Sequence, residues 1–269
     1  MTTEDFITSL FCRVDDQMKG VRKHSQASLY PSETVTLALL FAIKGVGNRP
    51  FYRWIRRDWL TLFPRLPERS RLFRLFSVFL RKRGKTHQGW TERFLAKPTL
   101  FGVTDSYGIE MIHPIREGRS NAQFGRKGLS NRRWIVGGKL CLLLNKFGLV
   151  VDWKADTANV SDQSFLPMIE KVKDEMIVFS DKGFHKKEGD PPNLKICPHG
   201  RWNDRMLIET VFSMQTLVCH LKKITHRVWE YFEMRLAFSL AAFNLLVQWQ
   251  GLKPNEQGFV PLSIAQFNL

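Results

Sequence analysis

Three carboxylates in the second half of the chain occupy places from which they could bind a divalent metal ion. Asp105 ends the first expected strand in "VTDSYG", Asp181 directly follows the apolar run "MIVFS", and Glu209 comes early in a helix expected to begin near residue 204. Carboxylate oxygens are hard ligands that suit Mg²⁺ or Mn²⁺. If the two strands are neighbours in a sheet that the helix covers, the acids can converge on two ions about 3.5–4 Å apart, an arrangement that serves phosphodiester chemistry.

Each of these acids also has an ordinary structural interpretation. Asp105 could be a turn residue in "TDSYG", and Asp181 stands before Lys182 and Gly183, which together are typical of a turn. Glu209 could be a solvated helix residue. The combination of the three acids with the order of strands and helix is what favours a metal site.

Arg205 adds a cation beside the third acid. It precedes Glu209 by four residues, so both side chains lie on one face of the expected helix. The guanidinium could bind a phosphate while the carboxylate binds metal. The alternative is an ion pair within the helix, worth about 0.3–0.5 kcal/mol at a surface. We count Arg205 among the candidate catalytic residues.

Residues from about 98 to 250 predict a domain with strands and helices in mixed order. The turn "NKFG" predicts that the second and third strands form an antiparallel hairpin. Ser161 marks the start of a short helix, and a long final helix is expected to break around "LKKITHR". The expected elements are strands ending near Asp105 and at 133–145, 148–156, 176–180 and 193–197, and helices within 161–175 and 204–249.

The first 97 residues predict a helical and strongly basic region. A helix is expected from Ser32 to Lys44, and a second one has apolar residues at helical spacing from Leu72 to Phe79. Residues 49–97 contain 14 Lys and Arg against three acids, which is a net charge of +11 out of the chain's +16. A solvated helix face is the alternative, but clustered cations favour contact with DNA phosphates. The candidate DNA-binding residues are Arg53, Arg56, Arg57, Arg71, Arg74, Arg81, Lys82 and Arg83.

Composition limits the class of protein. The chain has 269 residues, of which 43% are hydrophobic and 12% aromatic, and this indicates a folded protein and excludes a disordered one. Its 41 basic and 25 acidic residues favour a polyanionic partner. The four cysteines are scattered, as in a reduced cytosolic protein. A secretory signal and an apolar run long enough for a bilayer are not visible, so we expect a soluble protein without a membrane partner.

Other residues could contact DNA or support the site. Trp134 and Trp202 could stack on a base, although burial is the commoner state of an aromatic side chain. Asn159 and Asp162 in "ANVSD" are expected to form a turn and a helix cap, and they could support the site from behind the metal ligands.

The ordered set of segments resembles insertion-sequence DDE transposases with an RNase H-like catalytic domain, most closely those of the nine-eighty-two insertion-sequence group. The resemblance covers nearly the whole chain. The segment from "YPSETVTLALL" to "ERSRLFR" is similar to the amino-terminal region of that group. "VTDSYG" resembles its first-Asp strand, "DTANVSDQSFLPMI" its "ANVHD" segment and "SDKGF" its second-Asp strand. "NDRMLIET" is similar to the Arg-x3-Glu helix of related transposases.

The resemblance implies an RNase H-like mixed sheet flanked by helices and preceded by a helical, basic region. The implied division is a DNA-binding region at 1–97, a catalytic domain at 98–250 and a tail at 251–269. The implied activity is metal-dependent cleavage and strand transfer of DNA, with Asp105, Asp181 and Glu209 holding two Mg²⁺ or Mn²⁺ ions. The segment between Asp181 and Glu209 is too short for a large inserted domain, which speaks against a hairpin mechanism that needs one.

The resemblance also implies the partners and the location of the protein. The partners would be double-stranded DNA, both element ends and target, and at least one further copy of the chain. The location would be the cytoplasm of a prokaryotic cell, at the nucleoid. Two alternatives stay open, a metal-dependent DNA nuclease of the same fold and a DNA-binding derivative that has lost its activity.

Overall fold

The computed structural model describes residues 1–78, 90–119, 125–130, 133–197, 205–221, 224 and 228–251. The side chains of Val78, Trp90, Arg205 and Met206 are outside this description.

The N-terminal helices begin and end at residues that local chemistry explains. They are α1 (Thr3–Gln17), α2 (Pro31–Lys44), α3 (Asn48–Asp58) and α4 (Arg69–Val78). Thr2 and Asp5 cap α1 reciprocally, because the Asp5 amide donates to Thr2 Oγ1 at 3.1 Å and the Thr2 amide donates to Asp5 Oδ2 at 3.0 Å. Gly45 ends α2 in the left-handed conformation with a φ of 65°. The helix expected from Ser32 to Lys44 is confirmed.

The described residues form a six-stranded mixed sheet. Its strands are β1 (Phe101–Ile112), β2 (Arg126–Ser130), β3 (Arg133–Asn145), β4 (Val150–Thr157), β5 (Ile177–Ser180) and β6 (Leu194–Ile196). Their order is β2–β3–β1–β5–β6, and β4 pairs with the half of β3 that β2 does not reach. β3 is antiparallel to β1, β2 and β4, whereas β1, β5 and β6 run parallel to one another. The expected mixed sheet and the antiparallel hairpin of β3 and β4 are confirmed.

The first strand is longer than the sequence indicated. Asp105 was expected at its end, but β1 continues through Asp105 to Ile112. The reason is the partner strand, because Asp105 pairs with Leu142 and the antiparallel register continues to Glu110 opposite Gly137. The segment "TDSYG" is therefore the middle of a strand and not a turn.

Helices cover both faces of the sheet. On one face lie α6 (Arg205–Leu217) and α7 (Trp229–Gln250), and on the other lie the short helices η3 (Asp162–Phe165) and α5 (Leu166–Glu170). Alternation along β3 follows this division, because Leu140 and Leu142 pack with α7 whereas Cys141 and Leu143 pack with α5. The break expected in the final helix is confirmed, since α6 and α7 are separate helices.

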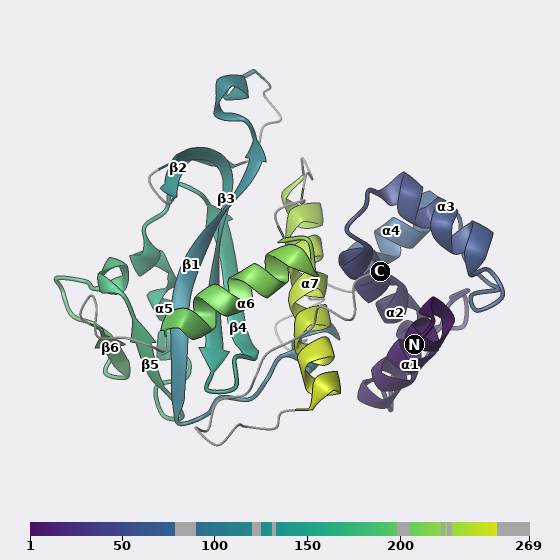
Figure 1. Cartoon of the computed structure of the whole chain (residues 1–269), viewed down its shortest axis with the longest axis horizontal. Helices are drawn as coiled ribbons and strands as arrows, with labels where there is room; N and C mark the ends of the chain where they lie inside the picture. Colours follow the sequence, from purple (N-terminus) through teal and green to yellow (C-terminus); the bar gives the residue numbers. More distant parts are fainter. Residues whose placement is uncertain are drawn as a thin grey trace.

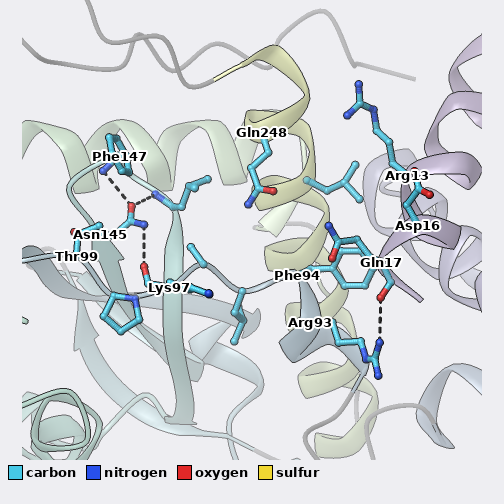
Figure 2. A pocket seen from close by; sticks show the side chains of 15 residues that line it. Arg13, Asp16, Gln17, Arg93, Phe94, Lys97, Thr99, Asn145, Phe147 and Gln248 are labelled. Atoms are coloured by element: carbon cyan, nitrogen blue, oxygen red, sulfur yellow. Dashed lines mark hydrogen bonds between the residues drawn. The ribbon is translucent and has the colours of Figure 1, made fainter. Parts of the chain in front are cut away.

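α7 joins the N-terminal helices to the sheet. Figure 1 shows α7 between the sheet and the group formed by α1 to α4. One apolar core contains Leu10 and Phe41 from that group, Phe243 from α7 and Leu142 from the sheet. Arg235 of α7 is also buried, and its Nη2 donates to the Ala42 carbonyl of α2 at 3.2 Å. No helix in the described part of the chain is long and apolar enough to cross a membrane.

Asn244 is a polar anchor inside this apolar interface. It is fully buried in α7, and its Oδ1 accepts a hydrogen bond from the Val150 amide at 2.8 Å. Its Nδ2 donates to the carbonyls of Phe94 at 2.9 Å and Val150 at 2.8 Å. A buried amide without a partner is costly, so Asn244 fixes the start of β4 against α7.

We predict that Asn244→Ala lowers the free energy of unfolding by about 1–3 kcal/mol, because the Val150 amide loses its acceptor inside the core. Urea titration followed by circular dichroism measures this loss. Gln250→Ala, at the exposed end of the same helix, is the control and should change stability by less than about 0.5 kcal/mol. Equal effects of the two substitutions would contradict the anchoring role.

Candidate functional site

Asp105 lies within β1, and Asp181 directly follows the neighbouring parallel strand β5. β1 and β5 pair in register, and their last pair is Val103 with Phe179. Asp105 lies two residues further along β1, and Asp181 lies two residues after Phe179, just past the end of β5. Alternation places Asp105 on the face that carries Phe101 and Phe179, whose rings stack with centroids 6.1 Å apart. Neighbouring strands are about 4.8 Å apart where they pair, and both aspartates lie just beyond the paired segment of β1 and β5.

α6 covers the same face of the sheet. The ring of Phe212 on α6 stacks on that of Tyr107 on β1, with centroids 5.0 Å apart. Tyr107 follows Asp105 by two residues and so shares its face. Glu209 lies one helical turn before Phe212 and is exposed. Figure 1 shows α6 crossing β1, with its first residues on the side of β5.

Asp181 also has the turn role that was its alternative interpretation. Its Oδ1 accepts a hydrogen bond from the Gly183 amide at 2.9 Å and caps the short helix η4 (Lys182–Phe184). The buried ring of Phe184 anchors that turn in the core below the sheet. The cap fixes the direction of the carboxylate, so the turn role and a ligand role are compatible.

Asp162 links β1 to β3 and borders the turn after β5. Its Oδ1 accepts hydrogen bonds from Ser106 Oγ at 2.5 Å and from Lys139 Nζ at 3.1 Å. Lys139 also donates to the Val160 carbonyl at 2.7 Å. A Cβ added to Gly183 would lie 2.8 Å from Asp162 Oδ2 and 3.0 Å from Asp181 Oδ1, so both carboxylates border the same glycine.

The "ANVSD" segment was only partly understood from sequence. The helix cap there is Ser161, whose hydroxyl accepts from the Gln163 amide at 3.4 Å, and not Asp162. Asp162 contacts Ser106, the residue after Asp105, and Lys139, and its support of a metal site stays a prediction. Ser106 and Lys139 were missed, although a lysine inside the apolar strand "GGKLCLLL" and a serine directly after Asp105 were visible signals.

The metal-binding potential of the site is incomplete in this conformation. Asp105 in β1 and Asp181 directly after β5 carry carboxylate oxygens, a donor type that suits Mg²⁺. Within the described residues, no three His, Cys, Asp or Glu side chains are grouped closely enough to hold a metal ion. Glu209 therefore lies on the covering helix without completing a group of three. The side chain of Arg205 is outside the described part of the chain.

A second candidate site is a groove lined by arginines between α3 and α4. Its volume is about 670 Å³, and we call it the arginine groove. It is lined by Arg49, Tyr52, Arg53, Arg56, Arg57, Glu68 and Arg69. Among described residues only one of its five arginines forms an ion pair, Arg57 with Asp58. The remaining positive charge faces solvent, as a phosphate-binding surface requires.

Most of the expected DNA-binding residues can be placed. Arg53, Arg56 and Arg57 line the arginine groove, and Arg71 and Arg74 are exposed on α4. Arg81, Lys82 and Arg83 lie outside the described residues. Arg49 and Arg69 belong to the groove but were not among the expected residues. Arg49 and Arg69 line the same groove only because α3 packs against α4.

Comparisons with protein-family models, with curated proteins and with solved structures gave no match to this chain.

We predict that Lys139 and Asp162 are energetically coupled. Both side chains are mostly buried, with 13% and 24% of their surfaces exposed, so their ion pair is shielded from water. A double-mutant cycle of Lys139→Ala and Asp162→Ala, measured by urea unfolding, should give a coupling energy of about 1–3 kcal/mol.

The control cycle uses the exposed pair Lys171 and Asp152, joined at 3.2 Å with 69% and 28% exposure. Its coupling should be below about 1 kcal/mol. Additive effects at Lys139 and Asp162 would contradict the linking role of Asp162.

Proposed function

We propose that this protein is a DNA transposase of the insertion-sequence type. Its catalytic domain would bind metal through Asp105, Asp181 and Glu209 and would cut and join DNA strands. The single observation that carries the proposal is the parallel register of β1 and β5, in which Asp105 and Asp181 each follow the last pair, Val103 with Phe179, by two residues.

The strand order supports an RNase H-like assignment of the sheet. β1, which carries the first acid, is central, with the antiparallel hairpin β3–β4 on one side and the parallel strands β5 and β6 on the other. The second acid follows the neighbouring parallel strand, and the third lies on a covering helix. This is the order that the resemblance implied for the catalytic domain.

The proposed chemistry has two steps at one site. Water first cleaves a phosphodiester bond at an element end and leaves a 3′-hydroxyl, which then attacks a phosphate of the target DNA and releases a new 3′-hydroxyl there. Asp105, Asp181 and Glu209 would hold the metal ions, and Arg205 would bind a phosphate of the substrate. When bound, two Mg²⁺ or Mn²⁺ ions would supply Lewis-acid stabilisation of the attacking and leaving oxygens.

The basic N-terminal helices would hold the element ends. The arginine groove offers Arg49, Arg53, Arg56 and Arg69 without ion pairs to described residues, so these cations are available to phosphates. Joining two ends implies at least two copies of the chain on the DNA. The cell compartment that fits this partner is the cytoplasm of a prokaryote.

Two alternatives use the same structure differently. A nuclease of this fold would hydrolyse DNA without joining it, and an inactive derivative would only bind it. A DNA end with a free 3′-hydroxyl, offered with a plasmid target and Mg²⁺, separates them: joined products support the transposase, hydrolysis alone supports the nuclease, and neither supports the derivative.

We predict that Asp105→Asn and Asp181→Asn each reduce Mg²⁺-dependent cleavage and joining by at least about 1,000-fold, because each removes a charged metal ligand. DNA affinity, measured by anisotropy without metal, should stay within about twofold. Asp174→Asn, an exposed acid of the same domain, is the matched control and should keep full activity. Unchanged cleavage by Asp181→Asn would remove Asp181 from the site.

We predict that Arg53→Gln combined with Arg56→Gln weakens DNA binding at every sequence tested. Two lost phosphate contacts should also reduce the slope of log affinity against log salt by about 1.8. The control is Lys171→Gln combined with Lys173→Gln, which removes the same charge from an exposed turn of the other domain. If both double variants behave alike, the arginine groove is not the DNA-binding surface.

A further inference from the structure

The tip of the β2–β3 hairpin presents an aromatic, apolar and cationic surface that nothing in the described structure covers. We call Lys127, Leu129 and Trp134 the hairpin patch. We infer that the hairpin patch binds an unpaired base of a DNA strand that extends from the carboxylate site. The inference rests on the proposed function for the identity of the nucleic acid. It adds one further DNA contact to that function.

The exposure of the patch follows from the lengths of the strands. The last pair of β1 with β3 is Ile112 with Val136, and beyond it β3 pairs with β2 alone. This two-stranded ribbon curls back toward β1, since a Cβ on Gly108 would lie 2.6 Å from both Ser130 Oγ and Ile135 Cδ1. β4 does not reach this part, because its pairing with β3 stops at Gly138. In Figure 1 the far end of β1 stands clear of α6 at the top of the view.

The side chains of the patch form one continuous surface. Leu129 and Trp134 pair directly across the two strands, with 58% and 55% of their surfaces exposed. Lys127 Nζ lies 5.3 Å from the centre of the Trp134 ring. Sequence alone favoured a buried Trp134, and the ribbon geometry overturns that expectation. An exposed indole beside an ammonium group suits a base and the phosphate attached to it.

The charge around the patch favours a polyanion as the occupant. Five basic side chains and two acidic ones are described at this end: Arg116, Arg119, Arg126, Lys127, Arg133, Glu110 and Glu117. The acids form ion pairs with Arg133 and Lys127, which leaves three positive charges in excess. A second copy of the chain would bring the same cations together, so charge complementarity favours DNA over self-association.

The patch lies on the same face of the sheet as the candidate site. Trp134 and Leu142 are eight residues apart on β3 and point to one face, and Leu142 pairs with Asp105. At 3.4 Å per residue the path along β3 is about 27 Å, and the curl of the hairpin toward Gly108 makes the direct distance shorter. Because stacked nucleotides also rise about 3.4 Å each, a strand of at most about eight nucleotides spans this distance.

The experiment compares two DNA probes in the Asp181→Asn background, where cleavage is removed. One is a blunt duplex and the other is the same duplex with an overhang of about eight nucleotides, and anisotropy gives both affinities. We expect tighter binding of the overhang, and Trp134→Ala should weaken that binding by about 5- to 100-fold while blunt-duplex affinity changes less than about twofold. Trp134→Phe should retain most of the preference, because it keeps an aromatic face.

Tyr30 supplies the matched control. It is 56% exposed, with Lys23 Nζ 4.4 Å from its ring centre, but it lies before α2 and not on the hairpin. Tyr30→Ala should leave the overhang preference unchanged, and an equal loss in Tyr30→Ala and Trp134→Ala would show a general effect of exposed aromatics and overturn the inference.

The remaining outcomes separate the inference from the proposed function. An unchanged preference in Trp134→Ala would overturn the inference alone, as would a parent protein that binds both probes equally. A change of oligomeric state in Trp134→Ala, seen by sedimentation without a change in overhang affinity, would assign the patch to contacts between copies. A parent that binds neither probe would overturn the proposed function and the inference together.

Discussion

The pairing of β1 with one strand on each of its edges is the constraint on which the candidate site depends. β3 holds one edge in antiparallel register and β5 holds the other in parallel register. A slip of one residue in either pairing would send an aspartate to the opposite face of the sheet. Gly102 permits β1 to lie close to Leu144 of β3 and to Met176. A Cβ there would lie 2.6 Å from the Leu144 carbonyl oxygen and closer still to Met176 Sδ.

The site is supported from both faces of this sheet. On one face α6 is fixed to β1 by the stack of Tyr107 and Phe212, and on the other Asp162 connects Ser106 and Lys139 to the turn after β5. Residues that are far apart in the chain are thereby held to one small region. Carboxylates that are held in place in this way need less reorganisation when they bind a charged group.

Positive charge is distributed over two separate surfaces of the protein. The arginine groove lies on the N-terminal helices, and the hairpin patch lies at the far end of β3. The long apolar helix α7, anchored by Asn244 and Arg235, connects the parts that carry them. A long polyanion can contact both surfaces at once, whereas a small ligand cannot.

The sequence by itself determined the elements whose signals are local. The Pro31 and Gly45 boundaries of α2, the "NKFG" turn and the break before α7 were correctly read, because caps, turns and apolar periodicity act within a few residues. Tertiary structure alone decided that Asp105 lies within a strand, that Trp134 is exposed and that Lys139 meets Asp162. These features depend on which strands become neighbours and how far each extends, and pairing between distant segments leaves no local pattern in the chain.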